Sequence, residues 1–323
     1  MQGGRLIWST SFSKIQFKIK PLLYRIIMRH FLAIAVISIL LPVFSYAQGA
    51  DHEYSVLVLG HSFSVDCTEH LPALAVEAGI DNFRIARFVK ANCSMEERYN
   101  FFLEDYDKGY AECDPGCIEW EKAKKTVKQA LEDRAWDAIV FQNSLENEGF
   151  YDKAQPWLNK MVTYILKVQK KKFKNTPRLC WNMFWPISVI LETSQSEPHR
   201  TRMAPYQQSS QIMFEHYVQA AKEISEQTLV KNVIPAGTTI MNLRASKLNT
   251  PEMKEFTRDG YHLSKGAGRY AAACTWFEYL LKPVYGISVL GNPLRLPDYD
   301  APVLDENALL LQEAAIKAVE KPW

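Results

Sequence analysis

The sequence lacks the features that metal-binding and nucleic-acid-binding proteins require. None of its six cysteines belongs to a pattern with a second Cys or His pair at metal-ligand spacing. A structural zinc site needs about four such ligands, so the sequence predicts no metal. No stretch is rich enough in Lys and Arg to form a groove for phosphate backbones, which argues against a nucleic-acid partner. The chain also lacks internal repeats and low-complexity segments.

The N-terminal 47 residues lack acidic side chains but contain six Lys or Arg. Their apolar run, Phe31 to Phe44, is 14 residues long, whereas a membrane-spanning helix needs about 18 or more. Small residues suited to signal cleavage follow at positions 45–47. We therefore expect a cleaved signal peptide over residues 1–47, with Met28 as an alternative start, and a periplasmic or secreted protein without membrane contact after cleavage. The alternative is an uncleaved membrane anchor.

The remaining residues, 48–323, have the length and apolar content of a single domain with one large core. Without the basic leader, the formal net charge of +2 becomes negative, so the mature protein is mildly acidic. All six cysteines lie in this exported part, where disulfides are allowed. Cys113 and Cys117 flank an Asp-Pro-Gly turn, and a local disulfide between them is slightly favoured over free thiols.

Short β-rich runs alternate with segments of helical periodicity, which predicts an α/β fold with a mostly parallel sheet and helices on both faces. The fold class is therefore a three-layer α/β/α sandwich with a five-stranded sheet. The predicted strands are 54–59, 83–89, 136–142, 178–184 and 233–239. The predicted helices are 69–78, 119–132, 154–172, 206–229, 264–281 with Ser264 as N-cap and Pro283 as its stop, and 305–319.

The stretch VLVLGHSFSV at residues 56–65 ends the first strand with a glycine and then presents Ser62. Ligands of open α/β sheets bind outside the carboxyl ends of the strands. A helix that begins near Asp66 would point its first amides toward Ser62, where they would stabilise negative charge. Ser62 is therefore a candidate nucleophile. The alternative is a helix-capping serine, although Ser64 is better placed to be the N-cap.

A serine nucleophile needs a base, and the base needs a group that orients it. The sequence DGYHLS places Asp259 three residues before His262, on a loop that leads into a helix. This spacing allows the carboxylate to reach the imidazole Nδ1 while Nε2 points toward Ser62. An Asp and a His at this spacing are a weak signal alone, and an ordinary loop histidine is the alternative.

Four blocks together indicate a family: GHSFSVD, ANCSMEE, WDAIVFQNS and DGYHLSKGAGRY. They resemble motifs of the SGNH/GDSL hydrolases and, more closely, those of a bacterial branch catalogued largely as a domain of unknown function. The resemblance runs from about Val56 to Tyr285. It implies a flavodoxin-like α/β/α fold and esterase chemistry without a metal or organic cofactor. It also implies Ser62 as nucleophile, His262 as base and Asp259 as the acid that orients the base.

The same resemblance implies an oxyanion hole built from three donors. One is the amide of Ser62, and another is a backbone amide from the second block. The family has glycine there, whereas this chain has Asn92, which tolerates positive φ better than other non-glycine residues. The third donor is the side chain of Asn143, with Gln142 as the alternative because strand alternation turns one of the two inward.

Three further side chains are candidates for a substrate pocket: His61, Gln142 and Trp185. His61 stands where the family usually has Asp or Asn. Trp185 follows the fourth predicted strand, where an aromatic ring either stacks on a sugar or fills the core.

We therefore expect an exported serine esterase that removes a small acyl group, most simply acetyl, from a carbohydrate or another small ester. The alternative is a non-catalytic carbohydrate-binding protein on the same scaffold. A flavodoxin-like cofactor protein is a distant third, since the first loop lacks the Ser/Thr/Gly run that would wrap a phosphate.

Overall fold

The computed structural model describes residues 52–192 and 196–323, which contain a seven-stranded sheet in the order β4-β3-β2-β1-β5-β6-β7. The predicted signal peptide and the alternative start at Met28 lie outside these residues. The strands are β1 (Tyr54–Gly60), β2 (Phe83–Val89), β3 (Tyr110–Cys113), β4 (Glu121–Ala123), β5 (Ala138–Phe141), β6 (Arg178–Asn182) and β7 (Asn232–Ile234).

The predicted fold class is confirmed, because the five expected strands form a continuous parallel sheet, β2-β1-β5-β6-β7. Every residue of β1 is buried, as its continuous apolar sequence indicates for a strand covered on both faces. Two short antiparallel strands, β3 and β4, extend the sheet beyond β2. The sequence did not predict them, because each is at most four residues long and β4 has only exposed residues.

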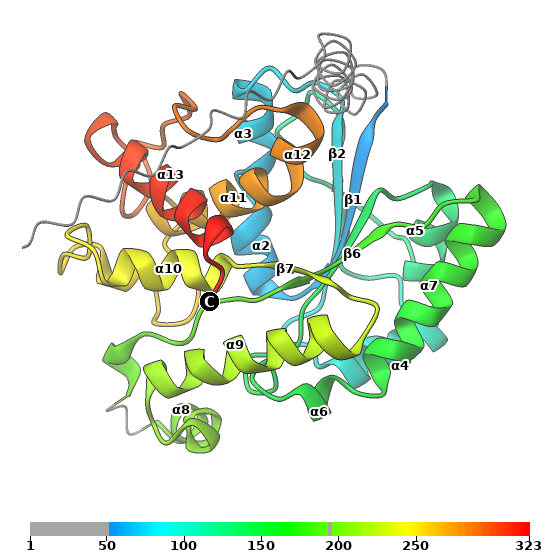
Figure 1. The fold of residues 1–323 in the computed structure, drawn as a ribbon, viewed down its shortest axis with the longest axis horizontal. Coiled ribbons are helices and arrows are strands. Elements are labelled where there is room, and N and C mark those ends of the chain that lie inside the picture. The colour runs from blue at the N-terminus through cyan, green and yellow to red at the C-terminus, as the bar shows by residue number, and fades with distance from the viewer. Residues whose placement is uncertain (1–51, 193–195) are drawn as a thin grey trace, which may run out of the picture. The chain divides into compact units, whose positions relative to one another are not determined.

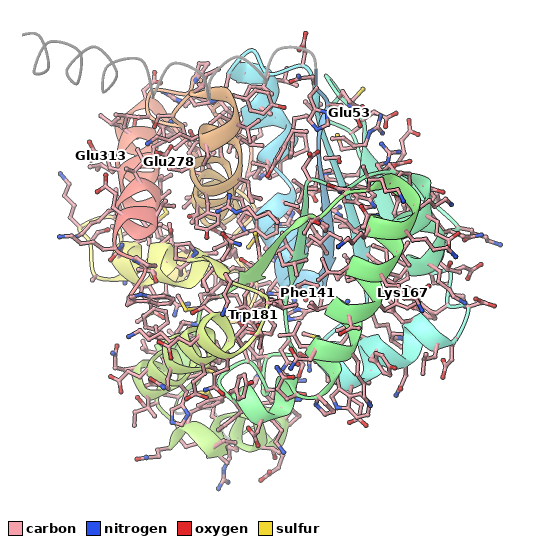
Figure 2. All side chains as sticks on the ribbon, turned by 45° about the vertical axis from the view of Figure 1, so that its right-hand side comes forward. Glu53, Phe141, Lys167, Trp181, Glu278 and Glu313 are labelled. Atoms are coloured by element: carbon pink, nitrogen blue, oxygen red, sulfur yellow. The ribbon has the colours of Figure 1, made fainter. Side chains whose placement is uncertain are left out.

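Helices cover both faces of the sheet (Figure 1). On one face lie α2, α3 and α11, and on the other lie α4, α5 and α7. Figure 2 shows Phe141 and Trp181 in the interior, whereas Lys167 on α7 and Glu313 on α13 point outward. The helices are α2 (Ser62–Thr68), α3 (Leu71–Glu77), α4 (Met95–Leu103), α5 (Val127–Asp133), α6 (Tyr151–Ala154), α7 (Trp157–Phe173), α8 (Glu197–Met203), α9 (Ser210–Gln227), α10 (Ala236–Arg244), α11 (Ala267–Trp276), α12 (Lys282–Tyr285) and α13 (Asp305–Glu320).

Two helix boundaries differ from the prediction near the site. The helix expected to begin near Asp66 is α2, which already begins at Ser62. The N-cap of α11 is Gly266, and Ser264 instead accepts a hydrogen bond from the Gly268 amide at 2.9 Å. Pro283 does not stop the chain's helical path, because a π-helical turn at 277–281 leads into α12.

The strand order reverses between β1 and β5, because β2 lies on one side of β1 and all later parallel strands lie on the other. Such a switch point opens a crevice outside the carboxyl ends of the strands. Ser62 lies two residues after Gly60, the last residue of β1, so the fold places it at this crevice.

The expected disulfide is not formed: Cys113 and Cys117 are both free, and the Cys113 Sγ lies 3.2 Å from the Cys117 carbonyl oxygen. The other four cysteines are buried thiols, as expected. In the part of the chain that the structure describes, we find no helix with the length and apolarity needed to span a membrane.

Candidate active site

Ser62, His262 and Asp259 lie within hydrogen-bond distance of one another in a continuous chain. The His262 Nε2 is 2.9 Å from the Ser62 Oγ, and the His262 Nδ1 is 2.7 Å from the Asp259 Oδ2. The Ser62 and His262 side chains belong to segments 200 residues apart in sequence. The structure therefore brings together the three residues that the sequence predicted as nucleophile, base and orienting acid.

The end of β1 is shaped to present Ser62 at the first position of α2. His61 caps this helix, since its Nδ1 accepts a hydrogen bond from the Phe63 amide at 3.3 Å. Gly60 is required because a Cβ atom there would collide with the Ser64 side chain. The expected N-cap role of Ser64 is wrong: Ser64 lies inside α2 and donates to the Gln142 Oε1. The Ser62 hydroxyl is thus free of a capping role and faces His262.

The loop that holds His262 is fixed by local hydrogen bonds. Asp259 accepts from the Tyr261 amide at 2.9 Å and from the His262 amide at 2.7 Å through one oxygen, which leaves the other for the imidazole. Gly260 has a φ of +84°, a conformation that glycine adopts without strain. The DGYH sequence therefore forms a compact turn that presents the carboxylate to Nδ1.

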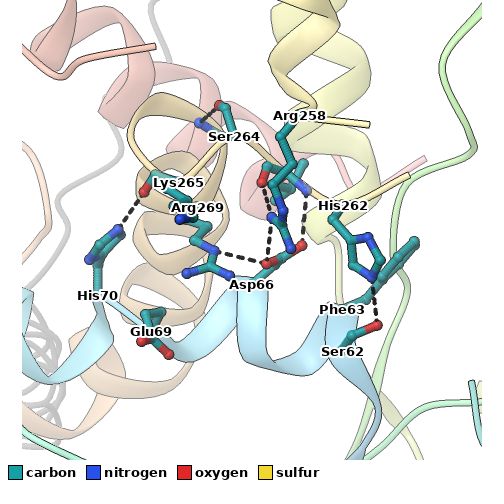
Figure 3. A network of polar contacts seen from close by, with 12 residues as sticks. Ser62, Phe63, Asp66, Glu69, His70, Arg258, His262, Ser264, Lys265 and Arg269 are labelled. Atoms are coloured by element: carbon teal, nitrogen blue, oxygen red, sulfur yellow. Dashed lines mark hydrogen bonds and ion pairs between the residues drawn. The ribbon is translucent and has the colours of Figure 1, made fainter. Parts of the chain in front are cut away.

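Asp66 joins the helix that carries Ser62 to the loop that carries His262 (Figure 3). Its carboxylate is fully buried and accepts from the Leu263 amide at 2.9 Å. The same carboxylate contacts the Arg269 Nε at 2.8 Å and the Arg258 Nη1 at 3.2 Å. Asp66 lies one helical turn after Ser62, and Leu263 directly follows His262. The role of Asp66 was not predicted from the sequence, although its place in the GHSFSVD block was a signal.

Two backbone amides are available for an oxyanion. The Ser62 amide is the first of α2 and has no intrahelical acceptor. The Asn92 amide also makes no hydrogen bond to residues 52–192 or 196–323. Asn92 has a φ of +41°, so it adopts the positive φ that was expected of it. Its side chain fixes this turn by accepting from the Leu145 amide at 3.0 Å and donating to Glu146 at 2.9 Å.

The structure places Asn143 differently from the expected third oxyanion donor. Its side chain is fully buried, and its Nδ2 donates to the Asn147 carbonyl at 3.2 Å. Its Oδ1 accepts from the Met95 amide at 3.0 Å. Asn143 therefore connects β5 to α4, and Leu145, not Asn143, lines the cavity beside Ser62. Gln142 does not line this cavity either: its Oε1 accepts from Ser64, and its buried Nε2 has no hydrogen-bond partner among the residues that the structure describes.

The cavity at the triad has a volume of about 350 Å³, and Ser62, Asn92, Asp259 and His262 all line it. Of the three expected pocket residues, only His61 contributes to this lining. Trp185 is fully buried and does not line the cavity. Its ring stacks on Phe63 at 4.7 Å, and its Nε1 donates to the Tyr261 carbonyl at 2.7 Å. Trp185 therefore packs against Phe63 and is hydrogen-bonded to the loop that carries His262.

His61 is a neutral structural group. Burial, reinforced by the nearby Arg98 guanidinium, lowers the pKa of His61 to about 3. Its Nε2 lies 2.8 Å from the Asn143 carbonyl oxygen, so Nε2 bears the proton and Nδ1 is the acceptor that caps α2. His61 is therefore neutral at ordinary pH, and both of its ring nitrogens are engaged in hydrogen bonds. For these reasons it does not act as a second acid or base at the site.

Replacing His61 by asparagine is expected to flatten the pH dependence of stability. The unfolded histidine takes up a proton below pH ~6.5, whereas the folded one does not until about pH 3. Stability is therefore lost as pH falls, by about 2 kcal/mol between pH 7.5 and 5.0. Asparagine retains a capping side chain without this titration.

Urea unfolding of both proteins at pH 5.0 and 7.5 measures this difference. His70, whose pKa burial also lowers, contributes the same slope to wild type and variant. An equal loss of stability in the two proteins at pH 5.0 would contradict a neutral His61.

No group of three or more His, Cys, Asp or Glu side chains within the described ranges is arranged to hold a metal ion.

Comparisons with known proteins identify relatives of this chain. The model of the family described as "Domain of unknown function (DUF4886)" matches residues 55–315. A crystal structure of a DUF4886 family protein from Bacteroides uniformis is 27% identical, with a TM-score of 0.69, and the match covers 83% of this chain and 95% of that one. No curated protein matches the chain.

Two further solved structures are more distant. A candidate SGNH hydrolase from Slackia heliotrinireducens has a TM-score of 0.45 and 16% identity, with 71% of this chain and 100% of that one covered. A lipase/acylhydrolase from Enterococcus faecalis has a TM-score of 0.42 and 11% identity, with 72% and 96% covered.

Proposed function

The chain belongs to the DUF4886 family, and from the geometry of its site we propose that it is an exported serine esterase that removes a small acyl group from a carbohydrate. Family membership agrees with the resemblance noted in the sequence motifs. The observation that supports the chemistry most directly is the contact of His262 with Ser62 at 2.9 Å on one ring nitrogen and with Asp259 at 2.7 Å on the other. Acetyl is the simplest acyl group for this role.

The proposed reaction begins when the Ser62 Oγ attacks the ester carbonyl carbon. His262 takes the serine proton through Nε2, and Asp259 keeps Nδ1 protonated and stabilises the imidazolium. The amides of Ser62 and Asn92 hold the oxyanion of the tetrahedral intermediate. His262 then gives the proton to the leaving alcohol, and an acyl-serine remains.

Water completes the cycle. His262 accepts a proton from water as the water attacks the acyl-serine, and the carboxylic acid leaves when Ser62 regains its proton. Each step uses groups that line the cavity. The export of the protein and the carbohydrate part of the substrate rest on the signal-like N-terminus and on the family resemblance.

A fluorophosphonate probe tests the nucleophile without knowledge of the natural ester. We expect Ser62 to displace fluoride and form a stable adduct, which mass spectrometry locates on the peptide that contains residue 62. His262→Ala should slow labelling at least ~100-fold, because a general base contributes about that much or more. Labelling of a different serine, or equal labelling rates in wild type and His262→Ala, would refute the proposal.

A further inference from the structure

A second and larger cavity adjoins the cavity of the triad. It has a volume of about 760 Å³, which lies in the range of small-molecule binding sites. Its walls come from the segment after β5, including Glu146, Phe150 and Lys153, and from α8 and its surroundings. In Figure 1, α6 and α8 lie beyond the edge of the sheet at which β1 ends. The two cavities share one lining residue, Arg202, so Arg202 borders both of them.

The larger cavity is lined by two acids and two cations, and the two cations have no ion-pair partner among the described residues. Its two acids are engaged: Glu146 accepts from the Asn92 side chain at 2.9 Å, and Glu197 lies 3.7 Å from Arg200. Its two cations, Arg202 and Lys153, form no ion pair with any residue that the structure describes. The Arg202 guanidinium lies 5.8 Å from the centre of the Tyr261 ring. Tyr261 is the residue before His262 in the sequence. An anionic substituent would therefore find an unoccupied cationic partner close to the triad.

The cavity also offers an apolar surface. Phe150 is half-buried, and its ring stacks on Tyr206 at 5.3 Å, so its position is fixed by the protein. The apolar face of a sugar ring packs well on such an aromatic surface. A ring with a negative substituent matches both features of this cavity.

We propose that the alcohol part of the ester carries a carboxylate, as in an acylated uronic-acid saccharide, and that Arg202 binds this carboxylate. This inference rests on the proposed esterase function. The small acyl group fits the cavity at Ser62, while the larger cavity takes the sugar on Phe150. A planar guanidinium can bind a carboxylate through two parallel hydrogen bonds, which sets the orientation of the sugar. Arg202 is thus a specificity-determining residue, whereas the bond-breaking steps remain those of Ser62 and His262.

The test compares Arg202→Gln with wild type on three esters: an acetylated oligogalacturonate, an acetylated neutral xylo-oligosaccharide and 4-nitrophenyl acetate. We expect kcat/KM to fall about 10- to 100-fold on the uronate ester, chiefly through KM, because a charge-assisted pair is lost. Activity on the two neutral esters should change less than about 3-fold. Lys167→Gln is the control for the loss of one positive charge, because Lys167 is exposed on α7, forms no ion pair with a residue that the structure describes and lines neither cavity.

Equal losses on all three esters would show a structural role for Arg202 and overturn the inference, and so would a wild type without preference for the uronate ester. A separate arm measures calorimetric binding of unacetylated oligogalacturonate to Ser62→Ala. Binding should weaken with salt and with the added Arg202→Gln change. If no ester is hydrolysed, the esterase proposal fails, but the binding measurement still tests the anion site. Binding that depends on Arg202 supports the anion site. Absent binding, or binding that does not depend on Arg202, overturns it.

Discussion

Ser62→Ala is expected to lower kcat for a small acetyl ester by about 10⁵-fold or more, to the residual rate that binding and oxyanion stabilisation alone provide. The reason is that alanine lacks the nucleophilic oxygen. In the wild type this atom, the Ser62 Oγ, lies 2.9 Å from the His262 Nε2. Hydrolysis of 4-nitrophenyl acetate, followed by absorbance, measures this loss. His262→Ala should cost about as much, and the double variant little more, because the groups act as a unit.

Ser64→Ala is the matched control for this change. It removes the same hydroxyl two residues along α2, from a side chain that contacts Gln142 and not His262. We expect its kcat to stay within about 10-fold of wild type. Equal activities of Ser62→Ala and wild type would exclude the serine mechanism and leave a carbohydrate-binding protein as the better explanation.

Asp66→Asn is expected to cost about 3 kcal/mol or more in the free energy of unfolding. The buried carboxylate accepts from the Leu263 amide and from two arginines, and removal of one partner of a buried ion pair leaves the others uncompensated. The same change should lower kcat about 100-fold, since loss of the Leu263 contact shifts His262 relative to Ser62. Urea unfolding measures the first effect, and ester hydrolysis at a temperature where the variant is fully folded measures the second.

Glu69→Gln provides the comparison at the C-cap of the same helix. Glu69 pairs with Arg87 at 2.9 Å but is 32% exposed, so its loss should cost less than about 1 kcal/mol and leave kcat unchanged. If Asp66→Asn lowers stability but leaves kcat and KM at wild-type values, Asp66 stabilises the fold without positioning His262.

Local patterns in the sequence predicted the parallel sheet, and the family resemblance identified the groups of the triad. The run YSVLVLG is apolar except for Ser55 and became the fully buried β1, and the predicted bounds of β2 agree with the structure. The Asp259 and His262 spacing was a weak signal alone, and the family resemblance identified the pair; in the structure the contact closes a local turn. Positive φ at Asn92 was expected from the same resemblance together with the tolerance of Asn for this conformation.

The errors concern side chains whose partners lie far away in sequence. Asn143 was expected at the oxyanion, but its Oδ1 contacts the Met95 amide, 48 residues earlier. For Trp185 the sequence left two alternatives, a sugar-stacking position and a core position, and the structure shows the core position: its Nε1 donates to Tyr261, 76 residues later. Strand alternation predicts on which face of the sheet a side chain lies. It does not predict which distant backbone groups that side chain will contact.

The sequence by itself thus determined the layered fold, the place of Ser62 after the first strand and the local turn that orients His262. Only the tertiary structure decided which groups meet at the site: the contact of Ser62 with His262, the Asp66 connection, and the position of Arg202 at the border of both cavities. The physical reason is range. Helix, strand and turn preferences act over a few residues, whereas these contacts form only when packing brings segments together that are up to about 200 residues apart.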